Sequence, residues 1–234
     1  MRILAVESSA KAASCAVVED GALIASAFQA TGLTHSRTLM PMVESMLHNS
    51  ELKLETMDAI AVAAGPGSFT GLRIGVSAVK GLAWALDRPC VAVSTLEAMV
   101  WPLAHMDTTL ICAMDARRQQ VYNAVFAAEV GSLRRLAPDR AISLAELAAE
   151  LDPARPYTVV GDGARLCRDA LLAMGFSACS LAPSHLLLQS AVGVGLRGEE
   201  LAREGKTVSP QALVPVYLRL SQAERERLER MGQG

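Results

Sequence analysis

The stretch that decides the fold is ILAVESSAKAASCAVVEDGALIASAF, residues 3–28 near the start of the chain. Two apolar runs of strand length occupy residues 3–7 and 14–19. The dipeptide Asp20-Gly21 is typical of a tight hairpin turn, and it leads into a third run at residues 23–28. We therefore expect three consecutive strands at the start of the fold.

Outward from this stretch, the pattern changes to alternating helices and strands. Helices are expected where apolar residues recur every three or four positions, and strands where short apolar runs are bounded by turn residues. In the first half the expected elements are a helix at 36–49, kinked at Pro41 or starting near it, a strand at 58–64, a helix at 71–86, a strand at 90–93 and a helix at 95–103. In the second half they are strands at 110–115, 121–127 and near Leu133, a helix opened by the capping box Ser143–Glu146, a strand at 157–161, a helix at 165–174, a strand at 179–181 and a helix at 186–204. The two halves have the same order of elements, which predicts a duplicated α/β unit.

The 234-residue chain is 51% hydrophobic and 20% charged, with a net charge of −2. This composition excludes a disordered protein. Aromatic residues make up only 4% and basic residues are not in excess, which argues against a chain that binds nucleic acid strongly by itself. The surplus of small and aliphatic residues raises the question of where all of them are buried.

Several features favour a cytoplasmic protein. The five cysteines are scattered through apolar runs without a CxxC pair, which is typical of reduced, buried thiols. Glu7 interrupts the first apolar run too early for a signal peptide. Residues 170–196 contain no Asp, Glu, Lys or Arg, but their turn residues predict a helix end, a short strand and a new helix rather than a membrane span.

The glycine-rich loop GPGSFTG at residues 65–71 links an expected strand to an expected helix. Such a loop can hold a phosphate at a helix N-terminus, but its spacing fits neither the Walker A nor the GxGxxG pattern, so a tight structural turn is the preferred interpretation. The turn after the first strand contains Ser8 and Ser9, and the corresponding turn of the second half contains Arg117 and Arg118. These four residues are candidate contacts for a nucleotide phosphate, although both turns lack the glycine that lets a backbone close on its ligand.

The histidines favour neither a metal site nor nucleophilic catalysis. His35, His48, His105 and His185 include no pair at the spacing that places two imidazoles on one helical face. The chain also has no GxSxG nucleophile elbow. We therefore expect no metal site, whereas Ser-His-Asp catalysis stays open on the sequence pattern alone.

Two of the expected helices carry wide apolar stripes. Core packing is the usual role of such a stripe, but Met40 widens the first one, and methionine is adaptable at protein–protein surfaces. A helix pair that buries one face and offers the other to a partner would account for part of the apolar surplus. The two stripes contain Leu39, Met42, Val43, Met46 and Leu47, and Leu72, Val76, Val79, Ala83 and Leu86.

Six segments, read together and in order, carry a family resemblance. They are ILAVESS at 3–9, HSRTLMP at 35–41, GPGSFTGLR at 65–73, STLE at 94–97, MDARR at 114–118 and PVYLR at 215–219. This ordered set resembles the TsaB (YeaZ) family, bacterial subunits that serve the synthesis of threonylcarbamoyladenosine in tRNA. The resemblance runs in register through the first half of the chain and more loosely to residue 219.

The resemblance implies an actin/Hsp70/sugar-kinase-like (ASKHA) fold of two RNase H-like lobes, each with a mixed sheet flanked by helices. This fold agrees with the duplicated order of elements. The lobes would comprise residues 1–105 and 106–220, with the last helix of the second lobe packing across the lobes. A charged tail would follow at 221–234.

The resemblance also implies a subunit without chemistry of its own. TsaD-type sequences, which are paralogues, carry paired histidines for a metal in the helix that corresponds to 36–49. Here only His35 lies at that edge, and Leu39 stands four residues on. The implied reaction, the transfer of threonylcarbamoyl to the N6 of an adenosine in tRNA, would belong to the TsaD-type partner.

The implied partners are a TsaD-type catalytic subunit and a TsaE-type ATPase, with a homodimer when the chain is alone. By resemblance, the helices at 36–49 and 71–86 form the docking surface, tRNA is contacted only indirectly, no cofactor is tightly bound, and ATP binds only in the assembled complex. Arg73, Arg117 and Arg118 are candidates to meet phosphate there. The residues implied at the partner surface are Leu39, Met42, Val43, Met46, Leu47, Leu72, Arg73, Val76, Val79 and Lys80.

Two other functions stay open at this point. One is an active enzyme of the same fold, either an ATPase or small-molecule kinase or a peptidase-like enzyme. The glycine-poor turns and the unpaired histidines argue against it. The other is a homodimeric interaction protein without a role in tRNA modification.

Overall fold

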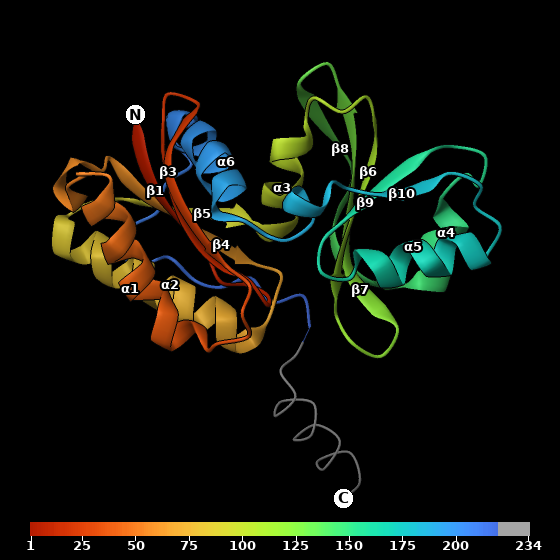
Figure 1. Cartoon of the computed structure of the whole chain (residues 1–234), viewed down its shortest axis with the longest axis horizontal. Coiled ribbons are helices and arrows are strands. Elements are labelled where there is room, and N and C mark those ends of the chain that lie inside the picture. The colour runs from red at the N-terminus through yellow and green to blue at the C-terminus, as the bar shows by residue number, and fades with distance from the viewer. Residues whose placement is uncertain (220–234) are drawn as a thin grey trace, which may run out of the picture.

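The computed structural model describes residues 1–219. The charged tail expected at 221–234 lies outside the described residues. Within them the chain forms two lobes, each built on a five-stranded sheet (Figure 1).

The elements of the first half are three strands followed by alternating helices and strands. They are β1 (Arg2–Glu7), β2 (Ala13–Glu19), β3 (Ala22–Gln29), α1 (His35–Asn49), β4 (Ala59–Gly65), α2 (Phe69–Leu86), β5 (Cys90–Ser94) and α3 (Thr95–Val100). The second half repeats this order. Its elements are β6 (Thr108–Asp115), β7 (Gln120–Glu129), β8 (Ser132–Ser143), α4 (Leu144–Glu150), β9 (Tyr157–Val160), α5 (Ala164–Ala173), β10 (Cys179–Leu181) and α6 (Ala191–Arg203).

The two sheets have the same topology. The strand orders are β3-β2-β1-β4-β5 and β10-β9-β6-β7-β8, so each sheet places its first strand between an antiparallel hairpin and two parallel strands. The expectation of a duplicated α/β unit with mixed sheets is therefore confirmed. This is the ASKHA arrangement of two RNase H-like lobes.

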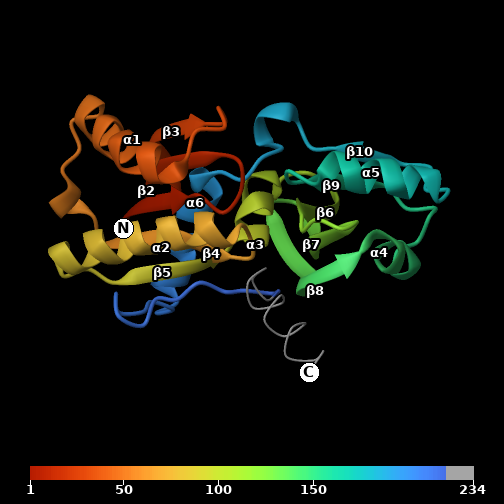
Figure 2. The same cartoon turned by 90° about the horizontal axis from the view of Figure 1, so that it is seen from below.

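Strand β1 shows how the layers of the first lobe are specified. Its side chains alternate between the two faces of the sheet. Leu4 and Val6 belong to a core formed with α1 and α2, whereas Ile3 and Ala5 belong to a second core formed with α6. A strand buried on both faces is apolar throughout, which is why the run at 3–6 lacks polar residues. Figure 1 shows α1 and α2 on one side of this sheet and α6 on the other, and Figure 2 views the molecule from the side of α1 and α2.

Helix α6 belongs in space to the first lobe although it follows the second lobe in sequence. It packs on β1, β2, β4 and β5 of the first sheet. Helix α3 lies between the lobes, and Leu96 and Val100 of α3 are part of the core of the second sheet. Helix α3, which precedes the expected boundary between residues 105 and 106, therefore contributes to the core of the second lobe. Helix α6, which follows that boundary, packs on the sheet of the first lobe.

A charged network also joins the lobes. The carboxylate of Glu97 on α3 lies 2.9 Å from Nε of Arg197 on α6 and 3.1 Å from Nη2 of Arg135 on β8. Asp139, on β8, pairs with Arg135 and accepts a hydrogen bond from the hydroxyl of Ser94. The carboxylates of Glu97 and Asp139 thereby connect residues of the two lobes.

Several element boundaries differ from those expected. Helix α2 begins at Phe69 rather than Gly71, because the hydroxyl of Ser68 caps it by accepting a hydrogen bond from the N–H of Gly71. The expected helix at 186–204 begins only at Ala191, where Ser190 is the cap residue. The capping box of Ser143 and Glu146 is present as predicted. Asp20 and Gly21 form the predicted hairpin turn with positive φ angles of 50° and 77°.

Residues 206–219 return along the first lobe to the space between the lobes, and we call this segment the C-terminal strap. The backbones of Cys90 and Val208 exchange hydrogen bonds, Lys80 donates to the carbonyl of Leu213 at 3.1 Å, and the N–H of Val216 donates to the carbonyl of Ala64 at 2.7 Å. The strap was not expected as an ordered element.

Residues 170–196 contain the end of α5, strand β10 and the start of α6. Within residues 1–219, the helices are all too short or too polar to cross a membrane.

Candidate functional site

The expected docking stripes on α1 and α2 are mostly core. Seven of the ten residues expected at the partner surface are buried within the chain itself, so they are not available to a partner, and the expectation is wrong for them. The physical reason is that an apolar stripe on a helix is used first to cover the sheet beneath it. The buried residues are Leu39, Val43, Met46, Leu47, Leu72, Val76 and Val79.

The exposed surface of the helix pair is formed by the residues next to these stripes. On α1, Met40 and Glu44 are exposed, one turn apart. On α2, the exposed residues include Ser77, Gly81 and Trp84, and the indole of Trp84 is 63% exposed at the end of the helix. We call these five residues the α1–α2 surface.

The remaining predicted docking residues lie at the borders of this surface. Met42 is partly buried beside β3, on the opposite side of α1 from Met40. Arg73 is exposed, lies 4.7 Å above the ring of Phe69 and donates from Nε to the hydroxyl of Tyr217 at 3.1 Å. Lys80 is held by the carbonyl groups of the strap.

A polar cleft of about 500 Å³ lies where the two lobes meet the glycine-rich loop. It brings together the turns after β1 and β6. Ser9 and Arg117 line the cleft, whereas Ser8 is turned into the first lobe and Arg118 does not contribute to the lining. The lining residues are Ser9, Ala10, Lys11, Gly67, Ser68, Phe69, Thr70, Met114, Asp115, Ala116, Arg117, Tyr122, Asp162 and Arg219.

The glycines of the loop serve close packing of backbone on backbone. A Cβ built on Gly67 would lie 2.5 Å from the carbonyl oxygen of Ser9, and one built on Gly71 would lie 2.1 Å from that of Ser8. The N–H of Ser68 also donates to the carbonyl of Ser9 at 2.6 Å. The loop therefore rests directly on the turn after β1, which supports the interpretation of a tight structural turn.

Glu7 is a buried acid at the inner end of this region. Its Oε1 accepts a hydrogen bond from the N–H of Ser9, while Oε2 has no hydrogen-bond partner within residues 1–219. Burial raises the pKa of Glu7 to about 7, against the lowering effect of its hydrogen bonds to Ser9. Near neutral pH this group therefore takes up or releases a proton.

Asp162 and Gln189 complete the polar cluster from the second lobe. Nε2 of Gln189 donates to Oδ1 of Asp162 at 3.1 Å, and burial raises the pKa of Asp162. Asp162 lies between the strand expected at 157–161 and the helix expected at 165–174, and nothing in the sequence pattern singled out Gln189. A buried polar residue in a loop becomes visible as a site residue only when the lobes are assembled.

The cleft is lined by residues of both charge signs. Lys11, Arg117 and Arg219 are cationic lining residues, and Arg219 also donates to the carbonyl of Ala116 across the lobes. Asp115 and Asp162 are acidic lining residues, and the negative charge of Asp162 helps to raise the pKa of the buried Glu7. The hairpin between β6 and β7 holds Arg117 and Arg118 at positive φ angles of 62° and 55°, which is uncommon for residues with a side chain.

His35 is the first residue of α1, and its Nε2 lies 2.6 Å from the carbonyl oxygen of Ala10. Leu39, one turn further along, has its side chain in the core. The helix therefore presents one imidazole and one buried aliphatic side chain where two metal-binding imidazoles would need to share a face.

Comparisons with known proteins agree on one family. The family model of TsaD, tRNA N6-adenosine threonylcarbamoyltransferase, matches residues 29–226. The tRNA threonylcarbamoyladenosine biosynthesis protein TsaB of Bacillus subtilis is 34% identical over 98% of this chain and 99% of its own length, and that of Escherichia coli is 31% identical over 94% and 95%. The structure of YeaZ from Pseudomonas aeruginosa has a TM-score of 0.79 at 29% identity and covers 93% of this chain and 99% of its own. The chain therefore belongs to the TsaB (YeaZ) family, as a paralogue of TsaD.

Proposed function

We propose that this chain is a non-catalytic subunit required for threonylcarbamoyladenosine formation in tRNA, acting in the cytoplasm. In this proposal it pairs with a TsaD-type catalytic subunit, which works with a TsaE-type ATPase. Its family supports the pathway, and its relation to the TsaD family model supports pairing between paralogues of one fold. The chain contributes a docking face that organises its partner's site, and ATP binds only in the assembled complex.

The observation that carries the docking proposal is Gly81 in the middle of α2. A Cβ built at this position would meet no atom within 4 Å, so nothing inside the chain requires a glycine there. Glycine in an exposed helix interior costs about 0.5–1 kcal/mol relative to alanine. A glycine here would allow the backbone of a partner helix to approach α2 closely, which accounts for the missing side chain.

The side chains around Gly81 have the character of an interface. Trp84 lies nearly one turn further along α2, and Met40 is exposed on the neighbouring α1. Tryptophan is enriched among residues that dominate binding energy, and methionine adapts to the shape of its partner. Glu44 and Ser77 supply polar groups beside these two apolar anchors.

Two features support the proposal that this chain has no catalytic activity of its own. The glycine-rich loop is packed on the turn after β1, so its glycines at 67 and 71 serve contact between two backbone segments of this chain. The buried, partly protonated Glu7 lies next to that turn and disfavours an anion. The alternative, an active ATPase, kinase or peptidase-like enzyme, is tested by the experiment below.

The test is to purify the chain with a TsaD-type protein and a TsaE-type ATPase, and to measure tRNA modification with and without the chain. We expect no turnover by the chain alone and loss of modification when it is omitted. Gly81→Arg and Trp84→Glu should lower affinity for the TsaD-type protein at least tenfold by isothermal titration. Leu172→Glu, an exposed apolar residue on α5 in the second lobe, is the matched control and should bind normally. Steady ATP hydrolysis by the isolated chain, or normal binding by both α2 variants, would overturn the proposal.

A further inference from the structure

The C-terminal strap has a firmly held root and a lightly held tip. The root, residues 206–216, forms two backbone hydrogen bonds of 2.9 Å between Val208 and Cys90, and it buries Leu213 in the core beneath α1 and α2. The tip, residues 217–219, continues from there to the second lobe. Figure 2 shows the strap running along the first lobe and ending where the two lobes meet.

On the first lobe, the tip is held by an aromatic stack at the surface. The ring of Tyr217 lies nearly parallel to that of Phe69, with the two centroids 3.9 Å apart and an angle of 6° between the planes. The guanidinium of Arg73 lies 4.7 Å from the centroid of Phe69, and its Nε donates to the hydroxyl of Tyr217. Tyr217 remains 37% exposed, and contacts of these kinds are individually weak at exposed positions. The tip can therefore leave Phe69 while the buried root stays in place.

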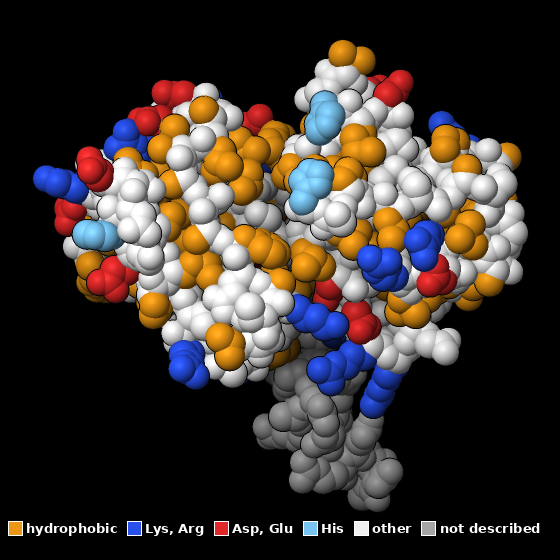
Figure 3. Space-filling model, viewed as in Figure 1, with side chains coloured by type: hydrophobic (Ala, Val, Ile, Leu, Met, Phe, Trp, Pro, Cys, Tyr) orange, Lys and Arg blue, Asp and Glu red, His pale blue; other side chains and the backbone are white. Residues whose placement is uncertain are grey.

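On the second lobe, the tip is held through Arg219. Its Nη1 donates to the carbonyl oxygen of Ala116, in the hairpin between β6 and β7. Arg219 also lines the polar cleft of about 500 Å³, and Figure 3 shows basic and acidic side chains gathered where the two lobes meet. One arginine of the strap thus connects the two lobes at the cleft.

The hairpin that Arg219 holds has an uncommon backbone conformation. Residues 117–119 have positive φ angles of 62°, 55° and 57°, although none of them is a glycine. Such a conformation persists only where the surrounding structure supports it. Here the N–H of Arg117 donates to Oδ1 of Asp115 at 2.7 Å, and Arg219 binds the carbonyl group just before the three residues, at Ala116. The strap tip therefore helps to fix the hairpin that carries Arg117 into the cleft.

We propose that the strap tip acts as a clasp on this cleft. In the closed state, which the structure shows, Tyr217 stacks on Phe69 and Arg219 binds Ala116, so the hairpin is fixed. In the open state the tip leaves both positions, the hairpin is free to change conformation, and solvent and small ligands reach the cleft. The root keeps the strap attached in both states. The clasp requires no partner protein, so it is tested on the chain alone, apart from the proposed docking function.

Three methionines of the chain report on the state of the clasp. Met114 lines the cleft and is only 2% exposed with the tip in place. Hydrogen peroxide transfers one oxygen atom to a methionine sulfur and leaves water, and an exposed sulfur reacts faster than a buried one. Met40 is 40% exposed on α1 and serves as the reference for an accessible sulfur, whereas Met57 is 0% exposed and serves as the reference for a core sulfur.

The first test is peroxide oxidation of the full-length chain, read by mass spectrometry of the methionine peptides. Tyr217→Ala and Arg219→Ala should each speed the oxidation of Met114 about tenfold, because local opening limits access to a buried group. Met40 and Met57 should react at their wild-type rates in both variants. Tyr217→Phe keeps the stacked ring, so its rate at Met114 should stay close to that of the wild type.

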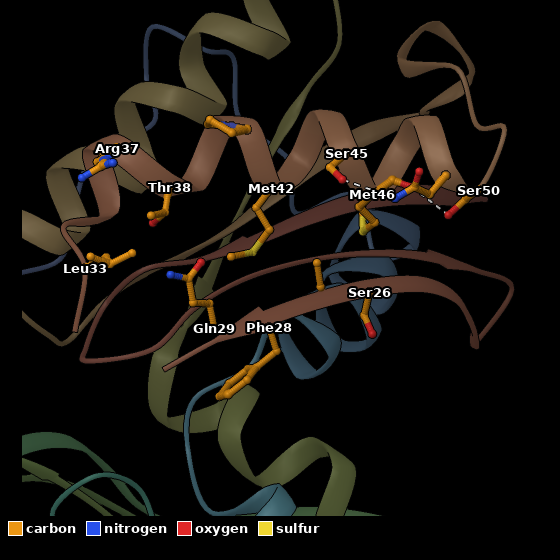
Figure 4. A pocket seen from close by; sticks show the side chains of 13 residues that line it. Ser26, Phe28, Gln29, Leu33, Arg37, Thr38, Met42, Ser45, Met46 and Ser50 are labelled. Carbon is orange, nitrogen blue, oxygen red and sulfur yellow. Dashed lines mark hydrogen bonds between the residues drawn. The ribbon is translucent and has the colours of Figure 1, made fainter. Parts of the chain in front are cut away.

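Arg37→Ala is the matched control for Arg219→Ala. Arg37 is exposed and lines a groove of about 620 Å³ between α1 and β3, where Figure 4 shows it near Thr38 and Leu33. The control removes the same side chain from a part of the first lobe that the strap tip does not contact. It should therefore leave the oxidation of Met114 unchanged.

The second test is hydrogen exchange of the hairpin in the same proteins. The N–H of Ala116 donates to the carbonyl of Gln120 at 3.0 Å, and the N–H of Gln120 donates to that of Arg117 at 3.1 Å. Both amides should exchange faster in Tyr217→Ala and Arg219→Ala than in the wild type. The amides of β9, in the core of the second lobe, should exchange at the wild-type rate.

Three results would overturn the proposal. The first is an unchanged rate at Met114 or in the hairpin when the tip is altered by either alanine substitution. The second is an equal effect of Tyr217→Ala and Tyr217→Phe, or of Arg219→Ala and Arg37→Ala. The third is faster oxidation of Met57 or faster exchange throughout β9, since the substitutions would then act through general unfolding.

Discussion

The hydroxyl of Ser8 donates a hydrogen bond to the carbonyl oxygen of Gly71 at 2.9 Å. This bond joins the turn after β1 to the first turn of α2. Since a Cβ on Gly71 would lie 2.1 Å from the carbonyl oxygen of Ser8, the contact depends on the absence of a side chain at residue 71. The glycine-rich loop is thus a packing element of the first lobe.

Two glycines on α2 predict opposite effects of the same substitution. Gly71→Ala should lower the free energy of unfolding by about 1–3 kcal/mol, because the new methyl group overpacks the Ser8 turn. Gly81→Ala should raise it by about 0.5–1 kcal/mol, because this site is open and helical. Urea unfolding of both variants measures the difference. Equal effects of the two substitutions would contradict the packing role of Gly71.

Substitutions at two neighbouring residues of α2 distinguish an effect on folding stability from an effect on docking. Val76 is buried in the core, so Val76→Glu introduces an uncompensated charge and should cost about 3–5 kcal/mol of unfolding free energy. Ser77 is exposed on the α1–α2 surface, so Ser77→Glu should leave stability within about 0.5 kcal/mol of wild type. Thermal melting checks the first effect, and titration with the TsaD-type protein checks whether Ser77→Glu weakens binding. A stable Val76→Glu variant would contradict the assignment of this stripe to the core.

The buried carboxyl of Glu7 predicts a pH-dependent stability. Burial raises its pKa from 4.5 to about 7 in the folded chain, so the folded state holds the proton more tightly than the unfolded state. The stability that this group contributes is fully present below pH 4.5 and is lost as the pH rises through 7. The loss amounts to about 3 kcal/mol.

Glu7→Gln removes this titration and leaves the other acids, including Asp162, in place. The stability of the variant relative to wild type should therefore rise by about 3 kcal/mol between pH 4.5 and pH 8. Urea unfolding of both proteins at several pH values measures this relative change. A constant difference across the range would show that Glu7 does not have a raised pKa.

The charged network around Glu97 predicts coupling between the lobes. Glu97→Gln leaves Arg135 and Arg197 without their shared carboxylate and should lower the free energy of unfolding by about 1–2 kcal/mol. Glu129→Gln is the matched control, since its ion pair with Arg134 is largely exposed and should contribute little. Calorimetry in low and high salt compares the two. If Glu129→Gln lowers the free energy of unfolding as much as Glu97→Gln does, the network does not contribute more to stability than an exposed ion pair.

The order of elements was predictable from local chemistry. The dipeptide Asp20-Gly21 predicts a hairpin turn, and the capping box at Ser143 predicts the start of a helix, each from a few neighbouring residues. Both features are present in the structure. The N-terminal end of α2 was placed two residues late, because the cap residue Ser68 lies within the glycine-rich loop. The start of α6 was placed too early, because residues 187–190 are not helical although the pattern is compatible with a helix.

The candidate site was less predictable. Periodicity shows that Leu39 and Val76 lie on apolar faces, but it does not tell whether a sheet or a partner covers them. The exposed residues Gly81 and Trp84 differ from core residues only once the sheet is in place. The cluster of Glu7, Asp162 and Gln189 combines residues far apart in sequence, and only the assembled lobes bring them together.

Helix α6 has a consequence for how the chain is made. The core of the second lobe uses residues from Leu96 to Leu187, whereas one face of the first sheet stays uncovered until Ala191–Arg203 has been synthesised. Domains usually fold in the order in which they leave the ribosome. Here the nascent chain can complete the second lobe while the first still waits for its last helix. The lobe that is translated first is the lobe that is finished last.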